Sequence, residues 1–263
     1  MRIGFFDSGI GGLTVLHQAM RLLPQEDYIF YADTLHVPYG EKSKEEVREY
    51  ILQAVEFIAN QKVKALVIAC NTATSIVIEE LRQRYSFPIL GIEPAVKPAV
   101  EKWEGRHKKV LVLATKLTLR EKKYHDLVSK VDHGDIVDSL PLPELVQFAE
   151  HFEFNEDKVI TYLKNELSAF DIEQYGTVVL GCTHFPYFKR SLRTLFPGDV
   201  DFISGSVGTA KNLKRILEAK NQIHDGTGDI QFFKSGIKVE DEEILSQYKE
   251  LFVILDELEK ELT

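Results

Sequence analysis

Short apolar runs alternate along this chain with longer stretches in which apolar residues recur at helical spacing. The short runs are rich in β-branched residues and predict buried strands at residues 3–6, 28–32, 65–69, 88–92, 110–114 and 178–181. The longer stretches predict helices at residues 13–23, 45–60, 75–85 and 157–170. Buried strands separated by helices are typical of parallel sheets, so we expect an α/β fold.

The end of the chain follows a different pattern, because it is acidic and its apolar residues lie near helical spacing. These residues would share one face of a helix that packs on the α/β unit: Leu251, Ile254, Leu255, Leu258 and Leu262. No low-complexity segment and no Pro-, Gly- or Ser-rich linker divides the sequence. We therefore expect any two lobes to be joined by short crossings and to face each other closely.

One internal similarity suggests such a pair of lobes. Residues 65–72 and 177–184 each run from an apolar strand through a small residue to a cysteine and a polar pair. The separation of the two cysteines, Cys70 and Cys182, suits a duplicated half rather than a short repeat. The similarity predicts two related half-sites that meet face to face.

Composition and charge restrict the class of protein. The chain has 263 residues, of which 44% are hydrophobic and 28% charged, as expected of a folded protein with a buried core. The formal net charge of -9 argues against a nucleic-acid partner, because phosphate binding depends on clustered Lys and Arg. No apolar run is long enough to span a membrane and no signal-peptide pattern is present, so we expect a cytoplasmic protein without a membrane partner.

The two cysteines carry the strongest indication of chemistry. Each follows a predicted strand, where parallel sheets bind ligands and where a following helix favours a thiolate. A lone cysteine is commonly a small buried hydrophobe, but two in matching contexts favour a function. Zinc is a weaker alternative, because Cys70, Cys182 and His184 supply three ligands and no CxxC or HExxH pattern occurs. A cysteine hydrolase would use Cys182 with His184 and leave Cys70 without a role.

Polar residues recur at other predicted strand ends. Asp7 and Ser8 open a glycine-rich loop that has neither a phosphate-loop nor a GxGxxG fingerprint, and Asp7 could hold an ammonium group or accept a proton. The other strand-end groups are mostly neutral donors: Asp33, Tyr39, Gly40, Asn71, Thr72, Thr115, Thr118 and Thr183. Such a set suits a small amino acid with carboxylates, although each Thr or Asn alone is also a common helix cap. Glu150 and His151 lie in a helical pattern typical of the protein surface.

Four motifs occur in order along the chain, at residues 7–14 (DSGIGGLT), 38–43 (PYGEKS), 69–74 (ACNTAT) and 181–184 (GCTH). Together they closely resemble the glutamate racemase family, over residues 3 to about 220. The resemblance implies two similar parallel-sheet α/β lobes related by pseudo-twofold symmetry, with the active site between them. It places Asp7 and Cys70 in a first lobe, residues 1–94 plus 207–263, and Cys182 and His184 in a second, residues 95–206.

The resemblance also implies an activity, the interconversion of L- and D-glutamate for peptidoglycan synthesis, without a cofactor or metal. Cys70 and Cys182 would exchange protons with opposite faces of the α-carbon, with Asp7 assisting Cys70 and His184 assisting Cys182. Asp7 and His184, together with six further residues, would hold the amino acid, and Asp33 and Glu150 match acidic positions linked to proton handling. The six are Ser8, Tyr39, Gly40, Asn71, Thr72 and Thr183.

Some questions stay open at the level of sequence. An aspartate racemase or another two-cysteine racemase of the same superfamily is the main alternative, and a passive amino-acid-binding protein with packing cysteines is the second. A homodimer is compatible with the acidic amphipathic helices. Residues 183–188 read THFPYF, where the family often has leucines after the proline, so we expect a change there in pocket lining or lobe packing.

Overall fold

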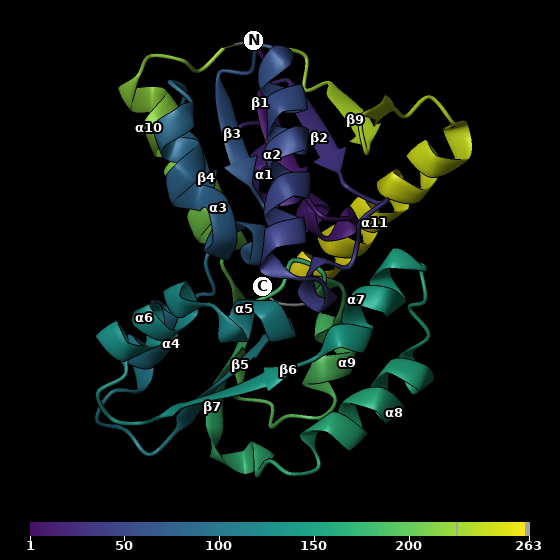
Figure 1. Cartoon of the computed structure of the whole chain (residues 1–263). Helices are drawn as coiled ribbons and strands as arrows, with labels where there is room; N and C mark the ends of the chain where they lie inside the picture. The colour runs from purple at the N-terminus through teal and green to yellow at the C-terminus, as the bar shows by residue number, and fades with distance from the viewer. Residues whose placement is uncertain (225, 261–263) are drawn as a thin grey trace.

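The computed structural model describes residues 1–224 and 226–260, which form two sheets stacked end to end (Figure 1). The upper sheet has the strand order β10-β9-β2-β1-β3-β4, and its neighbours are parallel except for the antiparallel pair β9 and β10. Its strands are β1 (Ile3–Asp7), β2 (Tyr28–Ala32), β3 (Ala65–Ile68), β4 (Ile89–Gly91), β9 (Ile230–Lys234) and β10 (Ile237–Lys238).

The lower sheet is parallel throughout and has the order β6-β5-β7-β8. Its strands are β5 (Lys109–Ala114), β6 (Val137–Pro141), β7 (Tyr175–Leu180) and β8 (Asp201–Ser204). Taken in chain order, these four strands are arranged as β1 to β4 are in the upper sheet. Cys70 follows β3 and Cys182 follows β7, so each thiol stands after the third strand of its series.

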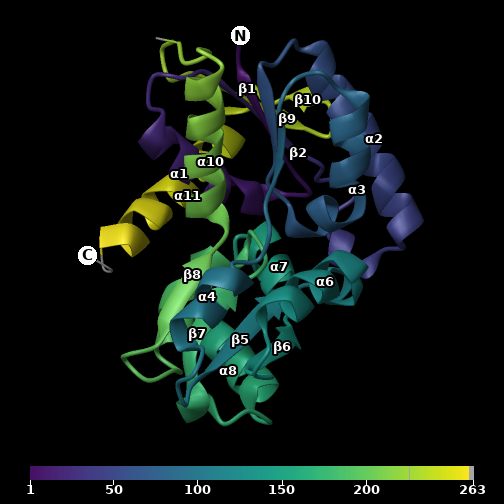
Figure 2. The same ribbon diagram turned by 90° about the vertical axis from the view of Figure 1, so that its left-hand side faces the viewer.

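Helices cover both faces of the upper sheet (Figure 2). Apolar side chains of α1, α10 and α11 pack on one face with Phe5 and Phe30, whereas those of α2 and α3 pack on the other with Phe6 and Ile29. These helices are α1 (Leu13–Leu22), α2 (Lys44–Asn60), α3 (Asn71–Arg84), α10 (Ser206–Ala219) and α11 (Glu242–Lys260). The cluster behind α1 and α10 continues into the lower lobe through Leu111 and Val178, so the two lobes share apolar packing.

Six helices belong to the lower lobe: α4 (Val96–Trp103), α5 (Lys116–Arg120), α6 (Lys122–Val131), α7 (Pro143–Glu150), α8 (Glu156–Leu167) and α9 (Lys189–Arg193). Short 3-10 turns complete the described elements: η1 (Ile10–Gly12), η2 (Tyr39–Glu41), η3 (Ile172–Gln174) and η4 (Phe185–Phe188). None of the helices within residues 1–224 and 226–260 has the length and apolar character needed to cross a membrane.

The predicted strands and helices are present, with shifted ends. The helix expected at residues 75–85 begins at Asn71, because the Cys70 sulfur accepts the N–H of Ala73 and caps it. In the C-terminal helix, Leu251, Leu255 and Leu258 are buried as expected, Ile254 is partly buried, and Leu262 lies outside the described residues. The predicted lobe boundaries stay a prediction, although the chain leaves the upper sheet after β4 and rejoins it at β9.

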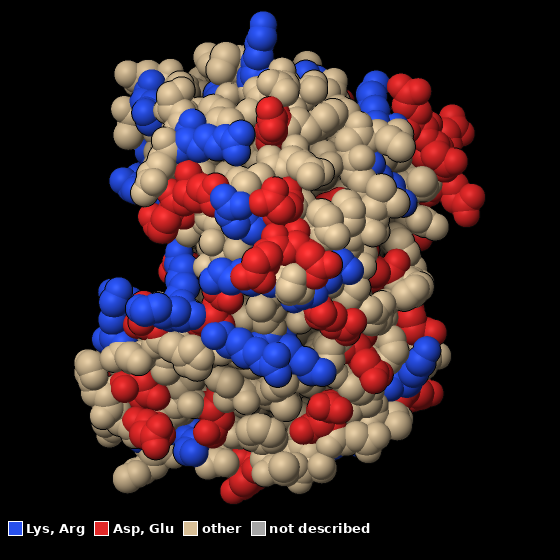
Figure 3. Space-filling model, in the orientation of Figure 1, with Lys and Arg blue, Asp and Glu red and all other residues tan. Residues whose placement is uncertain are grey.

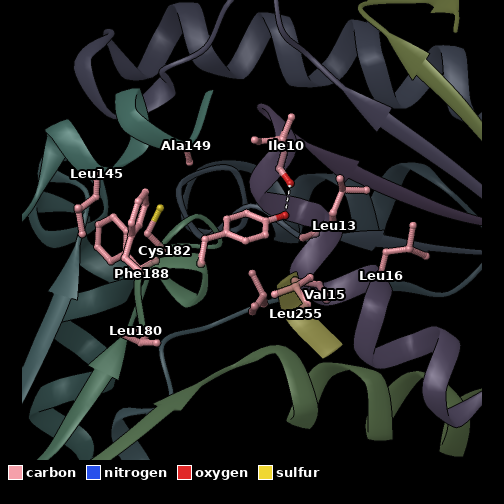
Figure 4. Close-up of a cluster of buried hydrophobic side chains, with 14 of the residues drawn as sticks. Ile10, Leu13, Val15, Leu16, Leu145, Ala149, Leu180, Cys182, Phe188 and Leu255 are labelled. Atoms are coloured by element: carbon pink, nitrogen blue, oxygen red, sulfur yellow. Dashed lines mark hydrogen bonds between the residues drawn. The ribbon is translucent and has the colours of Figure 1, made fainter. Parts of the chain in front are cut away.

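The departure after Pro186, at Tyr187 and Phe188, affects packing rather than the lining of the cavity described below. Tyr187 is buried and donates a hydrogen bond from its hydroxyl to the Ile10 carbonyl at 3.1 Å, which joins the two lobes (Figure 4). Phe188 packs in the same apolar cluster, near Leu145 and Cys182 (Figure 4). The Tyr187 ring therefore joins the two lobes, whereas the Phe188 ring packs against Phe154 of the lower lobe.

Candidate active site

A cavity lies where the carboxyl ends of the two sheets face each other, and both cysteines line it. The upper lobe contributes Ser8, Tyr39, Gly40, Cys70, Asn71 and Thr72. The lower lobe contributes Thr115, Cys182, Thr183 and His184. Cys70 and Cys182 are free thiols and each is 5% exposed. The two predicted half-sites therefore meet in one cavity.

Cys70 is held at the start of α3. Its sulfur accepts the backbone N–H of Ala73 at 3.4 Å and lies 3.8 Å from the Ser8 hydroxyl oxygen. Burial raises the pKa of the Cys70 thiol, and the nearby Asp7 raises it further, while the Ala73 N–H acts in the opposite direction. At neutral pH this thiol therefore rests with its proton in place.

Cys182 has a basic neighbour. Its sulfur lies 3.6 Å from Nδ1 of His184, and Nε2 of the same ring lies 2.6 Å from Oε1 of Glu150. Burial disfavours the charged ring, but the hydrogen bonds to Cys182 and Glu150 outweigh it and raise the pKa of His184 well above its ordinary value. The thiol, imidazole and carboxylate thus form a chain in which His184 carries a proton.

Asp7 lies behind the cavity wall rather than in it. Its carboxylate accepts the N–H of Gly9 at 3.0 Å and the hydroxyl of Thr183 at 3.2 Å, and it is fully buried. Burial raises the pKa of Asp7 to about 6, while His184 and the Gly9 N–H lower it. Asp7 is therefore suited to proton exchange near neutral pH, and it is not among the residues that line the cavity.

The glycine-rich loop after β1 does bring backbone N–H groups to anions, and these anions are side chains of the protein. Ile10 donates its N–H to Oε1 of Glu150 at 2.8 Å, across the two lobes. A Cβ on Gly9 would lie 1.8 Å from that oxygen, and one on Gly11 would lie 2.5 Å from Nδ1 of His184. The glycines are needed because the loop packs directly against the Cys182 half-site.

Three threonines connect the lobes on the opposite side of the cavity. Thr72 Oγ1 lies 3.0 Å from Oγ1 of both Thr115 and Thr118, which lie 2.9 Å from each other. Thr115 lines the cavity and caps α5, whereas Thr118 does not line it. Beside them Asn71 is 5% exposed, and its side-chain oxygen has no hydrogen-bond partner among the described residues. An orphaned buried acceptor of this kind is available to a ligand.

Asp33 also lies outside the cavity wall, where it supports Tyr39. Its carboxylate accepts the Tyr39 hydroxyl at 2.5 Å and the Ser235 hydroxyl at 3.0 Å, and it lies 2.9 Å from Nδ1 of His36. Burial and the nearby Asp33 raise the pKa of the Tyr39 hydroxyl, which therefore keeps its proton and donates. Asp33 thus fixes the loop that presents Tyr39 and Gly40 to the cavity.

The structure corrects the expectation that Glu150 is a surface residue. Its side chain is 11% exposed and contacts His184 and Ile10, whereas the neighbouring His151 is exposed and bonds only to Gln147 within its own helix. Pro38 and Glu41 of the motif at residues 38–43 also line the cavity, and sequence reasoning missed three further lining residues: Lys116, Pro143 and Val146. Lys116 directly follows Thr115, and this position next to a predicted site residue is the one indication of it in the sequence.

The comparisons with known proteins agree with this fold and site. Residues 13–211 match the family described as Asp/Glu/Hydantoin racemase. Glutamate racemase 2 of Bacillus subtilis strain 168 is 65% identical over 260 residues, which cover 99% of this chain and 98% of that protein. The chain therefore belongs to the Asp/Glu/Hydantoin racemase family and is an isomerase. Within this family it is an amino-acid racemase of the glutamate racemase group.

Solved structures lead to the same group. A glutamate racemase of Bacillus anthracis aligns with a TM-score of 0.76 and 31% identity, over 88% of this chain and 86% of that one. The enzyme of Francisella tularensis, solved in complex with D-glutamate, aligns with a TM-score of 0.79 and 28% identity, over 94% of this chain and 92% of that one. The two-lobed α/β fold is thus shared with these racemases.

Proposed function

We propose that this chain racemises glutamate by a two-base proton transfer in which Cys70 and Cys182 act on opposite faces of the α-carbon. The observation that carries the proposal is that the two thiols line one cavity from opposite lobes. Inversion at a carbon atom requires one group that removes a proton and another that returns a proton from the other side. A single cysteine with a base beside it, as in a cysteine hydrolase, would act on one face only.

The proposed proton transfer needs no electron sink beyond the cavity itself. One sulfur enters as a thiolate, takes the α-proton and becomes a thiol, while the electron pair of the broken C–H bond stays on the α-carbon and its carboxylate. The second thiol then gives its proton to the opposite face and becomes the thiolate. Hydrogen-bond donors around the carboxylate stabilise the charge while it develops.

The two sulfurs have different supporting groups. We propose that protonated His184 stabilises negative charge on the Cys182 sulfur whenever that sulfur acts as a thiolate, because a neighbouring cation favours that form. Cys70 rests as a thiol, since burial and Asp7 oppose its ionisation. Such a pair is ready for one direction of racemisation, and Asp7, whose pKa is raised to about 6, can take or return a proton at Cys70 for the other.

The remaining lining residues suit an amino acid. The Ser8, Thr72 and Thr183 hydroxyls and the backbone N–H groups of Tyr39 and Gly40 would bind its carboxylates. The unpartnered oxygen of Asn71 would accept a hydrogen bond from its ammonium group. Glutamate is favoured as substrate because the Francisella tularensis relative was solved with D-glutamate bound.

Further proposals concern the setting of the enzyme. We propose that it supplies D-glutamate for peptidoglycan and works in the cytoplasm, because a reducing compartment keeps both thiols free. A homodimer also stays a prediction, which sedimentation of the purified protein at several concentrations would test.

Proton NMR in deuterium oxide tests the main proposal, with L-glutamate, D-glutamate and L-aspartate offered separately to metal-free enzyme without cofactor. Loss of the α-proton signal of glutamate, with growth of the opposite enantiomer, is the expected result. The Cys70→Ser and Cys182→Ser variants should each lower kcat by about 10²–10⁴-fold while remaining folded. Exchange on aspartate alone would move the assignment to aspartate, and unchanged rates in either variant would overturn the two-thiol mechanism.

A further inference from the structure

The turn that carries Tyr39 and Gly40 to the cavity is held from behind by His36, a residue to which the proposed proton transfer gives no role. His36 is partly exposed and does not line the cavity. Its Nδ1 lies 2.9 Å from Oδ1 and 2.9 Å from Oδ2 of Asp33. A contact with both oxygens of one carboxylate fixes the orientation of that carboxylate.

The direction of this hydrogen bond follows from the other partners of Asp33. The Tyr39 hydroxyl donates to Oδ2 and the Ser235 hydroxyl donates to Oδ1, so both oxygens act as acceptors. An ionised carboxylate has no proton to give, and His36 therefore donates from Nδ1. His36 and Tyr39 thus donate to the same buried carboxylate, which links the two side chains.

A stacking contact with α2 holds the imidazole in this position. The ring of His36 lies nearly parallel to the ring of Tyr50, with centroids 3.7 Å apart and an angle of 10° between the planes. Tyr50 in turn lies beside Tyr39, with ring centroids 6.4 Å apart. The plane of the imidazole is thus fixed by Tyr50, and its Nδ1 points at Asp33.

Other contacts near this turn lie at the surface. Side chains of both charges mix at the waist of the molecule, where the two lobes meet (Figure 3). One pair joins the exposed Lys44, which follows the turn, to Glu121 of the lower lobe. Water and salt screen exposed pairs, whereas the hydrogen bonds of Asp33 act in a buried setting. The Asp33 cluster is therefore the stronger restraint on the turn.

We propose that His36 is a positioning residue for racemisation, which holds Asp33 and thereby keeps Tyr39 and Gly40 in place in the cavity wall. This inference rests on the proposed function and extends it to a residue outside the cavity. The two thiols belong to other loops, after β3 and β7, so a loosened turn weakens substrate binding more than it slows proton transfer. The effect of His36 should therefore appear mainly in KM.

Two variants separate the hydrogen bond of His36 from its stacking contact. His36→Phe keeps a ring beside Tyr50 but cannot donate to Asp33, and we expect it to raise KM for both glutamate enantiomers about three- to tenfold, with kcat within about threefold. His36→Asn keeps an N–H donor near the position of Nδ1 and should keep KM within about twofold of the parent. A His36→Asn variant as impaired as His36→Phe would overturn the proposal.

The matched control is His17→Phe. His17 also bonds a carboxylate, that of Asp256 at 2.8 Å, and its ring stacks on Phe252 with centroids 6.2 Å apart. It lies on α1 and does not line the cavity. His17→Phe should lose stability in urea unfolding while its KM and kcat stay those of the parent. The same result in His36→Phe would give His36 a structural role alone and overturn the proposal.

A double variant tests whether His36 acts on Tyr39 through Asp33. In Tyr39→Phe the hydrogen bond to Asp33 is already absent, so adding His36→Phe should change KM by less than about twofold. If the two substitutions instead multiply each other's effect on KM, the residues act independently and the proposal fails.

Binding measurements separate this proposal from the racemase proposal. Titration calorimetry with D-glutamate measures affinity whether or not the protein turns it over. A parent that binds D-glutamate about three- to tenfold more tightly than His36→Phe supports the role of His36 even if no racemisation occurs. Equal affinities, or no binding to either protein, would overturn it whatever the rate of racemisation.

Discussion

The two thiols occupy equivalent places after the third strand of each sheet, yet their surroundings differ. Cys70 is followed by Asn71 and Thr72, and its partners are the Ser8 hydroxyl and a backbone N–H. Cys182 is followed by Thr183 and His184, and its partner is an imidazole backed by a carboxylate. The duplication thus preserves strand order and the place of the thiol, while the groups that control each proton differ between the halves.

The difference has a structural origin. Glu150 ends α7, and the loop that receives its carboxylate comes from the upper lobe through Ile10 and Gly9. The Cys182 half-site is thus completed by the opposite lobe. Asp7 in turn reaches toward the lower lobe, because it accepts the Thr183 hydroxyl. Each thiol therefore depends on contacts that exist only when the two lobes are packed together. Variants at the two half-sites measure how strongly each thiol depends on them.

The largest effect is expected from His184→Asn, which removes the protonated imidazole beside Cys182. We expect kcat to fall about 10²–10⁴-fold, since that is what a general acid or base contributes. The equilibrium constant between enantiomers is one, so kcat/KM must fall equally in both directions. The substrate isotope effect need not be equal, because only the direction in which Cys182 removes the proton breaks the substrate's C–D bond at the damaged half-site.

Rates with α-deuterated L- and D-glutamate would show this asymmetry. The control is Thr72→Val, at the matching position of the other half, where we expect a smaller loss of kcat. If His184→Asn gave the same substrate isotope effect from both enantiomers, the two half-sites would be kinetically alike and the comparison would fail.

The equivalent thiols could be predicted from sequence, but the unequal neighbours could not. Periodicity and the Cys70 and Cys182 contexts indicated the strands and the shared site, because buried strands are nearly all apolar. The strands β6, β8 and β9 went unnoticed because they are only partly buried and mix polar with apolar residues. Whether Glu150 or His151 faces inward depends on how α7 packs against the rest of the protein, and the local sequence pattern does not predict this packing.

An intermediate effect is expected from Gly9→Ala, which disrupts the contact of Glu150 with Ile10 and His184 in the Cys182 half-site. The added Cβ would lie 1.8 Å from Oε1 of Glu150, so the carboxylate must move away from both Ile10 and His184. We expect kcat to fall roughly 10- to 100-fold and stability to fall by about 1–3 kcal/mol, as overpacked sites do. Urea unfolding and glutamate kinetics measure the two changes.

Gly208→Ala is the matched control. Gly208 lies in α10, where an added Cβ has nothing within 4 Å. This variant should keep the activity of the parent and gain about 0.5–1 kcal/mol of stability, since Ala favours a helix. Parent-like kcat in Gly9→Ala would show that the Glu150 contact with the upper lobe is not needed for catalysis.

The smallest effect on rate, and a distinct one on stability, is expected from Asp7→Asn. Burial raises the pKa of Asp7 from an ordinary 3.8 to about 6, so the folded protein keeps a proton that the unfolded chain has lost. Well below pH 3.8 Asp7 is protonated in both the folded and the unfolded state, and its burial then has no pH-dependent effect on stability. As pH rises toward 6 the folded state is progressively penalised, by up to about 3 kcal/mol above pH 7. Asp7→Asn removes this penalty and should lower kcat about tenfold.

Urea unfolding of the parent and Asp7→Asn between pH 4 and pH 8 measures this effect. The stability gained by Asp7→Asn should grow as pH rises through 6 and vanish near pH 4. Asp27→Asn is the opposite case, because hydrogen bonds from Thr227 and Asp229 lower the pKa of Asp27. That variant should lose stability at neutral pH, and the loss should shrink in acid. A pH-independent difference between the parent and Asp7→Asn would mean that Asp7 does not titrate near neutrality, and Cys70 would then have no carboxyl group with which to exchange its proton.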